Sequence, residues 1–442
     1  MKSQLSLTLC LYGLREKKYN WLFKNDINTV KWKKASPISE FYLFQPSNNK
    51  LLEHYYSFNK ITEIFPVNNV GMVTARDNLT IQFTKEEIYK TVRNFAYLDI
   101  ELARQTYKLG EDVRDWKVEW AQKDLKDSGV DRDNVVKISY RPFDTRFTYF
   151  TGNSRGFHCM PRGDFMKHFR KNNLGILVCR QQNSIGFYHA FIANTLFEAC
   201  VVSNRTREIN YGFPLYVNIE KEPKKKGTFT QIMLFEPEVK YQGRIPNINP
   251  EIFEQRKKDY RKEPSPEDIF YYIYAILYSN TYREKYAEFL KIDFPRIPFT
   301  KDYRLFIKLS KLGLQLAELH LLKAKELDKQ IIRLCEEGSN RVDKVNFVPG
   351  GSAKISKKRT KDEPQITGNV YINETQYFEE IPQEVWEYQI GGYQVCEKWL
   401  KDRKGRTLTK EEITTYCKIV TALNKTIKIQ EEIDELYDEV EE

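Results

Sequence analysis

Side chains that can pair with nucleic-acid bases are concentrated between residues 141 and 210. This segment contains eight arginines, two lysines and only four acidic residues. Two short polar runs within it, RQQNS at 180–184 and SNRTR at 203–207, combine arginine with Gln or Asn. The guanidinium fork of arginine matches guanine edges and phosphates, and the amides of Gln and Asn match adenine. The composition of these two runs therefore indicates contact with nucleic acid.

We expect two groups of contact residues. The side chains predicted to read bases or to contact nearby phosphates are Arg180, Gln181, Gln182, Asn183, Asn204, Arg205 and Arg207. The side chains predicted to contact phosphates are Arg141, Arg146, Arg155, Arg162, Lys357, Lys358 and Arg359. An alternative stays open, in which the aromatic residues between them form a core and some arginines form internal ion pairs. The run YRPFDTRF at 140–147 is a place where one such pair is expected.

Motifs for catalysis are not found in the sequence. Methylation of a DNA amine needs a Gly-rich loop and an Asn/Asp-Pro-Pro-aromatic tetrapeptide, and the nearest matches, PGG at 349–351 and NPE at 249–251, are incomplete. A P-loop and a GxGxxG fingerprint are also absent. Glu238 and Lys240 fit half of a restriction-nuclease site, but such triplets recur by chance in a chain rich in Glu and Lys. We therefore expect no catalytic residue and no bound cofactor in this chain.

Cysteine and histidine usage argues against a metal site and a disulfide scaffold. The seven cysteines are far apart without any CxxC pair, and the five histidines are scattered. This usage is typical of the reducing cytoplasm. No run approaches the ~20 apolar residues of a membrane helix. The opening LSLTLCLY at 5–12 alternates apolar and polar residues, which predicts a strand with no partner close in sequence.

The distribution of charge favours an anionic partner. The chain carries a net charge of +10, and eight of its acidic residues lie in residues 431–442, which contain no Lys or Arg. The rest of the chain therefore has a net charge of +18. A folded body with this charge is typical of proteins that bind nucleic acid.

The residue patterns predict an α+β fold with a mixed lobe of short strands, a helical spacer and a long C-terminal helix. Helical sequence begins after the N-cap Thr84 and continues with interruptions to about Leu125. Short strands follow, with one helix near 162–171 among them. The expected strands are VVKISY, RFTYF, LGILVCR, HAFIA, EACVVS and FPLYV, between residues 135 and 217.

Helices dominate the remaining sequence. Helices are expected at about 251–261, 267–278 and 280–291. The longest clear helix is expected at 301–335, where Leu305, Leu309, Leu312, Leu316 and Leu319 form one apolar face. A loop at 338–368, a small αβ piece at 369–404 and a helix from Thr409 almost to the end complete the chain. The predicted domain boundaries are 1–66, 67–218, 219–337 and 338–442.

Several long blocks resemble one known family. YRPFDTRFTYF (140–150), RGFHCMPRGDFMKHF (155–169) and NLGILVCRQ (173–181), followed by FPLYV, resemble the C-terminal specificity region of type ISP restriction–modification enzymes, which are related to type IIG enzymes. Blocks at 66–81, 268–299 and 370–406 resemble the same family in the same order. The resemblance extends over nearly the whole chain from about residue 12.

This resemblance implies sequence-specific recognition of double-stranded DNA for an adenine-specific methyltransferase. S-adenosylmethionine, and Mg and ATP for cleavage, are then expected only on partner domains or subunits. The N-terminal strand resembles the last strand of a methyltransferase domain, so we expect a split subunit, a truncated gene or a fragment. We also expect a cytoplasmic location and no membrane partner. The alternative is an interaction subunit that docks on a methyltransferase and binds little DNA by itself.

Overall fold

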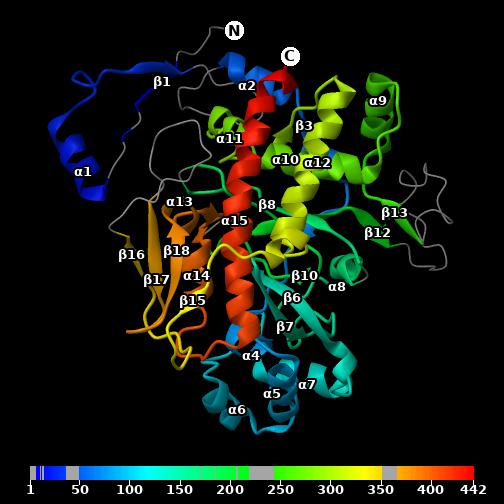
Figure 1. Cartoon of the computed structure of the whole chain (residues 1–442), viewed down its shortest axis with the longest axis vertical. Coiled ribbons are helices and arrows are strands. Elements are labelled where there is room, and N and C mark those ends of the chain that lie inside the picture. Colours follow the sequence, from blue (N-terminus) through cyan, green and yellow to red (C-terminus); the bar gives the residue numbers. More distant parts are fainter. Residues whose placement is uncertain are drawn as a thin grey trace. The chain divides into compact units, whose positions relative to one another are not determined.

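The computed structural model describes residues 6–9, 11, 14–35, 49–170, 172–184, 186–205, 208–218, 243–350 and 366–442 (Figure 1). The chain divides into two compact units, Met1–Phe58 and Asn59–Glu442. The mixture of helices and small sheets confirms the predicted α+β class. The predicted boundaries at 66, 218 and 337 are not tested by this division and stay predictions.

In the described residues of the first unit there are two short strands and two helices. The strands β1 (Ser6–Thr8) and β2 (Lys33–Ala35) pair antiparallel, and the helices are α1 (Arg15–Lys24) and α2 (Asn49–Tyr56). The strand expected at the N-terminus is present, but the expectation that it has no close partner is wrong, because β2 pairs with it. Helix α1 buries none of its residues.

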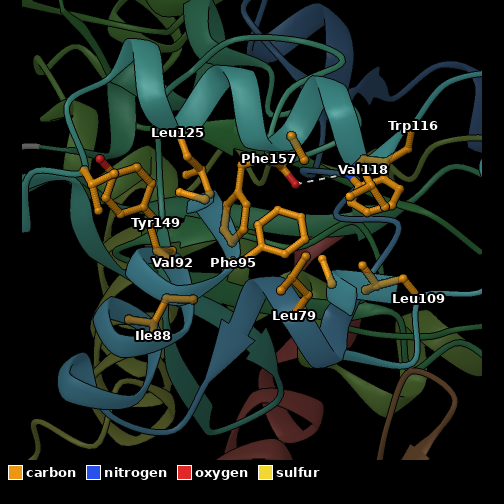
Figure 2. Packing of buried hydrophobic residues seen from close by; sticks show 14 of the residues in the cluster. Leu79, Ile88, Val92, Phe95, Leu109, Trp116, Val118, Leu125, Tyr149 and Phe157 are labelled. Atoms are coloured by element: carbon orange, nitrogen blue, oxygen red, sulfur yellow. Dashed lines mark hydrogen bonds between the residues drawn. The ribbon is translucent and has the colours of Figure 1, made fainter. Parts of the chain in front are cut away.

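The second unit begins with a helical subdomain around one aromatic core. Its elements are β3 (Asn59–Lys60), α3 (Ile61–Ile64), β4 (Asn69–Val70), α4 (Asp77–Thr80), β5 (Ile81–Gln82), α5 (Lys85–Tyr97), α6 (Ile100–Tyr107) and α7 (Val118–Asp127). Thr84 and Glu87 form the capping box that begins α5, as the sequence predicted. Figure 2 shows Phe95 and Phe157 in the centre of the core, where the Trp116 indole donates to the Phe157 carbonyl at 3.2 Å.

Two four-stranded sheets follow. The first has the order β10-β6-β7-β5, in which β6 (Val135–Arg141), β7 (Asp144–Tyr149) and β10 (Leu196–Phe197) join β5. The second has the order β4-β11-β8-β9, in which β8 (Gly175–Cys179), β9 (Ala190–Ala193) and β11 (Asn210–Pro214) join β4. Every residue of β8 and β9 is buried, which explains their continuous apolar sequence.

Smaller elements complete this region. They are η1 (Arg132–Asn134), α8 (Gly163–Met166), η2 (Lys167–Phe169), β12 (Tyr216–Asn218) and β13 (Arg244–Pro246). The helix expected near 162–171 is therefore two short turns. The strand expected at 198–203 is wrong, because only Glu198 bridges Met72 and the chain then turns. The Glu198 side chain accepts from the Cys200 amide at 2.7 Å, which stabilises that turn.

A helical layer covers the second sheet. It consists of α9 (Pro250–Tyr260), α10 (Pro266–Tyr278), α11 (Asn280–Lys285), β14 (Arg296–Ile297), α12 (Tyr303–His320) and η3 (Lys325–Asp328). The predicted leucine face of α12 is buried and packs on α10. The expected extension of this helix to residue 335 is wrong. Leu322 takes a positive φ of 54°, which ends the helix after His320.

The last part is the predicted αβ piece with its long helix. A sheet of order β15-β18-β17-β16 contains β15 (Leu334–Cys335), β16 (Asn346–Pro349), β17 (Thr367–Tyr371) and β18 (Tyr377–Pro382). The strand β16 lies where a loop was expected. The remaining elements are α13 (Gln383–Trp386), β19 (Gln389–Ile390), β20 (Tyr393–Gln394), α14 (Val395–Lys401), α15 (Lys410–Tyr437, red in Figure 1) and η4 (Asp438–Val440). Helix α15 begins after Thr409, as predicted, and Thr409 and Glu412 form a capping box at its start.

A buried ion cluster joins the first sheet to this last part. Asp144 accepts from Arg146 at 2.7 Å and from Arg403 at 3.0 Å, and Arg403 also pairs with Glu412 at 3.2 Å. Asp144 and Arg403 are almost inaccessible to solvent. Nearby guanidinium groups hold the pKa of Asp144 below its usual value although its burial opposes this. The cluster therefore fixes the β6–β7 hairpin against α14 and α15.

Candidate nucleic-acid interface

The two polar runs singled out in the sequence lie at the same end of one sheet. Strand β8 leads into the turn at 180–184, and the second turn, of which the structure describes residues 203–205 and Glu208, precedes β11. The two strands pair antiparallel with Cys179 opposite Asn210, so the turns are adjacent. The structure thereby brings together two of the regions that the sequence predicted to read bases.

The carboxylate of Glu208 connects the two turns. It accepts from the backbone N–H of Asn183 at 2.6 Å and from the Ser184 hydroxyl at 3.3 Å. It also accepts from His189 Nε2 at 3.0 Å and from the Ser203 hydroxyl. Burial by itself would raise the pKa of Glu208, but these hydrogen bonds hold its pKa below the usual value. A buried negative charge is therefore the common anchor of both turns.

Arg180 leaves β8 with a side chain that is 53% exposed. Its Nε donates to Asp293 at 3.1 Å, and Asp293 also pairs with Lys60 at 2.8 Å. Within the described residues, the terminal nitrogens of Arg180 make no hydrogen bond. The carboxylate therefore orients the guanidinium while its bidentate edge stays available to a ligand.

The next two residues are held by the segment at 291–293. Gln181 is exposed, and its amide donates to the Ile292 carbonyl at 3.3 Å. Gln182 is buried. Its side-chain amide donates to the Gly186 carbonyl at 3.0 Å, and its backbone N–H donates to the Lys291 carbonyl at 3.2 Å. Gln182 thus stabilises the turn, and its burial argues against the predicted contact with a base.

Three further members of the turns that the structure describes are exposed, whereas Ser184 and Ser203 are buried. Asn183 and Asn204 present their side chains at the surface. Arg205 is also exposed and donates to the Ser184 hydroxyl at 2.9 Å, which links the second turn to the first. These three side chains lie where a ligand at the sheet end can reach them.

Two arginines assigned to phosphates are instead buried inside the protein. Arg141 pairs with Glu198 at 2.8 Å and covers the Tyr140 ring, with 3.8 Å between guanidinium carbon and ring centre. Arg146 pairs with Asp144 at 2.7 Å. The internal pair expected within 140–147 is confirmed. A guanidinium that is buried and paired is not presented to a backbone phosphate, so we remove both residues from the proposed contact set.

Arg155 and Arg162 are more accessible than this pair. The Arg155 side chain is 63% exposed and lies 3.7 Å from Asp115 and 6.0 Å from the centre of the Trp120 ring. Arg162 is half-buried and lines an open cavity of about 500 Å³ with residues such as Asn68 and Ser154. Arg155 thus remains compatible with a phosphate contact at the surface.

Some predicted residues lie outside the described part of the chain. These are Arg207, the basic run Lys357, Lys358 and Arg359, and the half-site residues Glu238 and Lys240. Their assignments stay predictions from the sequence.

Comparison with known proteins identifies the family. The model of the Type ISP C-terminal specificity domain matches residues 63–432. The chain belongs to the Type ISP C-terminal specificity domain family. A search of curated proteins finds no match.

Three solved structures share the fold of this Type ISP specificity domain. A nuclease-deletion mutant of the Type ISP restriction–modification enzyme LlaGI, in complex with a DNA substrate mimic, matches 95% of this chain with a TM-score of 0.60 and 20% identity. The DrdV–DNA complex matches 94% with a TM-score of 0.62 and 19% identity. The ATP-dependent Type ISP enzyme LlaBIII bound to DNA matches 91% with a TM-score of 0.59 and 18% identity. The specificity domain spans only 32%, 42% and 25% of those chains, respectively.

The structure of this specificity domain also adds residues that the sequence did not single out. Arg170 is exposed beside the Phe150 ring, and its place in the arginine-rich segment was the available signal. Tyr188, Arg283 and Tyr388 line a second cavity beside the turns. No sequence signal links these three residues, because they lie far apart along the chain and converge only in the fold.

Searches for metal sites and membrane spans are negative in the described residues. No group of three or more His, Cys, Asp or Glu side chains is arranged to hold a metal ion in that part of the chain. Among the helices of the described ranges, none is both long and apolar enough to cross a membrane.

Proposed function

We propose that this specificity domain reads a base sequence in double-stranded DNA for an adenine-specific restriction–modification system. The observation that carries the proposal is the pair of polar turns anchored on Glu208 at one sheet end. They expose two amides, Asn183 and Asn204, beside the oriented guanidinium of Arg180. These groups suit adenine and guanine edges in the major groove. Family membership and the DNA bound in the similar structures support the choice of partner.

The proposed system needs a methyltransferase as partner. The 442 residues contain neither of the two methyltransferase motifs, so we assign methyl transfer from S-adenosylmethionine to a separate domain or subunit. Any cleavage that requires Mg and ATP belongs to further partner domains. Incubation of the purified chain with DNA and labelled S-adenosylmethionine is expected to transfer no methyl group until the partner is added.

A second candidate function, docking on a protein partner, is favoured by α1. This helix buries no residue, and its Phe23 and Leu22 side chains are 89% and 54% exposed. Exposed apolar side chains on one short helix are typical of a protein-binding surface. We propose a methyltransferase as the protein bound there. Replacing Phe23 by Ser is expected to weaken capture of that methyltransferase, and to leave duplex binding by the chain itself unchanged.

The test of base reading is selection from a randomised duplex library by the complex with the methyltransferase. Arg180→Ala is expected to lose about 1–3 kcal/mol at one base pair and to relax the selected motif there, because the bidentate edge is removed. Arg155→Ala is the matched control, since it removes an arginine outside the two turns whose side chain is 63% exposed, against 53% for Arg180. It should weaken all sequences about equally.

A motif that is unchanged by Arg180→Ala and by Asn204→Ala would contradict the assignment of these turns to base reading. If the wild-type complex selects no motif at all, the proposed function itself is wrong.

A further inference from the structure

A polar cavity of about 500 Å³ opens beside the two turns. It is formed by parts of the chain that are far apart in sequence: the turns, α11, the segment before β19 and α15. The residues that matter for its chemistry are Ser184, Arg205, Arg283, Glu387, Tyr388 and Gln430. Its volume lies in the range of small-ligand pockets.

Arg283 contributes a buried positive charge to this cavity. The residue is only 5% exposed, and its Nε donates to the Leu277 carbonyl at 2.7 Å. Its Nη2 is buried without a hydrogen-bond partner among the described residues. No carboxylate in that part of the chain lies within ion-pair distance of it. This guanidinium therefore lacks a counter-charge. Its burial is unfavourable in free energy because a buried charge is stabilised only when it is paired.

The neighbours of Arg283 do not neutralise this charge. Its guanidinium lies 4.6 Å from the Tyr278 ring centre and 5.9 Å from that of Tyr188, which are cation–π contacts with neutral rings. Burial raises the pKa of Tyr388, so this phenol stays protonated and donates to Gln430 at 2.8 Å. These side chains order the cavity wall and supply no anion.

Arg205 adds a second guanidinium to the same cavity. It is exposed and donates to Ser184 through one terminal nitrogen, which leaves its other donors for a ligand. Among the described residues that line the cavity, Glu387 is the acidic one. It is exposed and accepts from Gln383 at 2.8 Å. Two arginines with aromatic and amide neighbours match an oxyanion with several acceptor oxygens.

We propose that this cavity binds a phosphate group through Arg283 and Arg205. The proposal deepens the proposed function and rests on it for one of two phosphate sources, the backbone of the recognised DNA. The other source is a free phosphate-bearing small molecule. In both cases the phosphate supplies the counter-charge that Arg283 lacks, and Arg205 closes over it from the second turn.

The first experiment measures affinity for inorganic phosphate and for duplex DNA at low salt, using the full chain. Arg205→Gln is expected to weaken binding at least about tenfold, because one charge-assisted contact is lost. Arg283→Gln should do the same, and Arg205→Gln keeps the test valid if that buried variant does not fold. Glu387→Gln removes the opposing charge and should strengthen binding. Arg114→Gln, at a side chain that is 90% exposed and does not line the cavity, is the charge-matched control.

The second experiment distinguishes the two sources. Duplexes with a single neutral methylphosphonate are scanned along the site in wild type and in Arg205→Gln. If a backbone phosphate occupies the cavity, a methylphosphonate at one position weakens duplex binding by the wild type. The same methylphosphonate then causes no further loss of binding in Arg205→Gln. If a free phosphate is the ligand, inorganic phosphate binds in the absence of DNA and no methylphosphonate position behaves in this way.

The outcomes separate this inference from the proposed function. The cavity assignment is overturned, and DNA recognition stays intact, if three variants bind duplex DNA with equal affinity. These variants are Arg205→Gln, Arg283→Gln and Arg114→Gln. Phosphate binding that depends on Arg205, with no duplex binding by the wild type or its complex, supports the cavity and overturns DNA recognition. Failure of both ligands to bind overturns the cavity proposal.

Discussion

Glu208 shows how one side chain can define a recognition surface. It is fully buried, yet three donors from the two turns converge with His189 on its two oxygens. A carboxylate without these donors would be strongly destabilised by its burial. Both turns are therefore restricted to the conformation that satisfies the carboxylate, and their exposed side chains inherit that restriction.

Replacing Glu208 by Gln should disturb both turns together. The amide keeps the shape but presents one N–H group to donors, so at least one hydrogen bond is lost and its donor is left unpaired. We expect a loss of roughly 2–3 kcal/mol in the free energy of unfolding. Urea denaturation measures it, and the selected DNA motif should broaden as well.

Glu254→Gln is the control for this change, because Glu254 is exposed on α9. It should alter the free energy of unfolding by less than about 0.5 kcal/mol. Equal stability of the two variants would show that Glu208 does not anchor the turns.

Arginine identity alone did not reveal the fate of each arginine. The excess of arginine over acid near residues 141–210 correctly indicated a special region, and the internal pair near 140–147 was expected. However, Arg141 finds its carboxylate in Glu198, 57 residues away, whereas Arg180 remains exposed. Burial depends on which strands pair, so the sequence could not separate a structural arginine from a surface one.

At the scale of elements, the contact between α10 and α12 depends on a glycine. A Cβ atom placed on Gly313 would lie 1.8 Å from the Tyr271 carbonyl oxygen. At this position the two helices approach so closely that there is no room for a side chain on Gly313. This close approach lets the apolar face of α12 pack directly on α10.

Gly313→Ala should therefore destabilise the protein, although alanine is the better helix former. The gain in helix propensity is at most about 1 kcal/mol, whereas the overlap forces the helices apart at a cost of roughly 1–3 kcal/mol. Gln315→Ala, at an exposed position of the same helix, is the control and should be nearly neutral. A thermal unfolding midpoint that rises in Gly313→Ala would contradict this account of the packing.

Helix faces and caps were predictable, whereas helix ends and distant pairings were not. The leucine spacing in α12, the N-cap at Thr84 and the helix start near Thr409 are local signals, and all are present in the structure. The end of α12 depends on a positive φ at Leu322, and because this residue is not a glycine the sequence gives no signal for it. The cavity beside the turns was not predictable, because its lining comes from residues as distant as Ser184 and Gln430.

At the scale of the whole molecule, two buried histidines couple stability to pH. His158 is bonded to Thr148 at 2.8 Å, and His320 to Tyr274 at 2.6 Å and Thr426 at 3.0 Å. Burial lowers the pKa of both imidazoles to about 3. In the unfolded chain they regain the ordinary pKa of about 6.5. Between these values the unfolded state binds protons that the folded state does not, so stability falls as the pH is lowered.

Removing one of these histidines should reduce that dependence. In His320→Gln, the slope of unfolding free energy against pH between pH 6 and 4 should decrease by about 1.4 kcal/mol per pH unit. The slope is the measurement, so a uniform loss of stability in the variant does not affect the test. An unchanged slope would mean that His320 is protonated in the folded protein.

The charge of the whole chain predicts electrostatic DNA binding. Two carboxylates of the acidic end are engaged within the protein: Asp434 accepts from Ser279 at 2.7 Å, and Glu441 pairs with Lys285 at 2.6 Å. The logarithm of duplex affinity should fall with the logarithm of salt concentration at a slope of about −0.9 per phosphate contacted. Binding titrations from low to physiological salt measure this slope. An affinity that does not change over that range would exclude a mainly electrostatic interaction.

The buried cluster of Asp144 and Arg403 has a consequence for how recognition can be exchanged between related proteins. In a chimera that receives only residues 67–218 from a relative, the residue at position 144 comes from the relative, whereas Arg403 comes from this protein. A mismatch there leaves a buried charge without its partner, whichever bases the turns read. Specificity can therefore be transplanted only when the hairpin and the residues before the last helix travel as a pair, although 259 positions separate them.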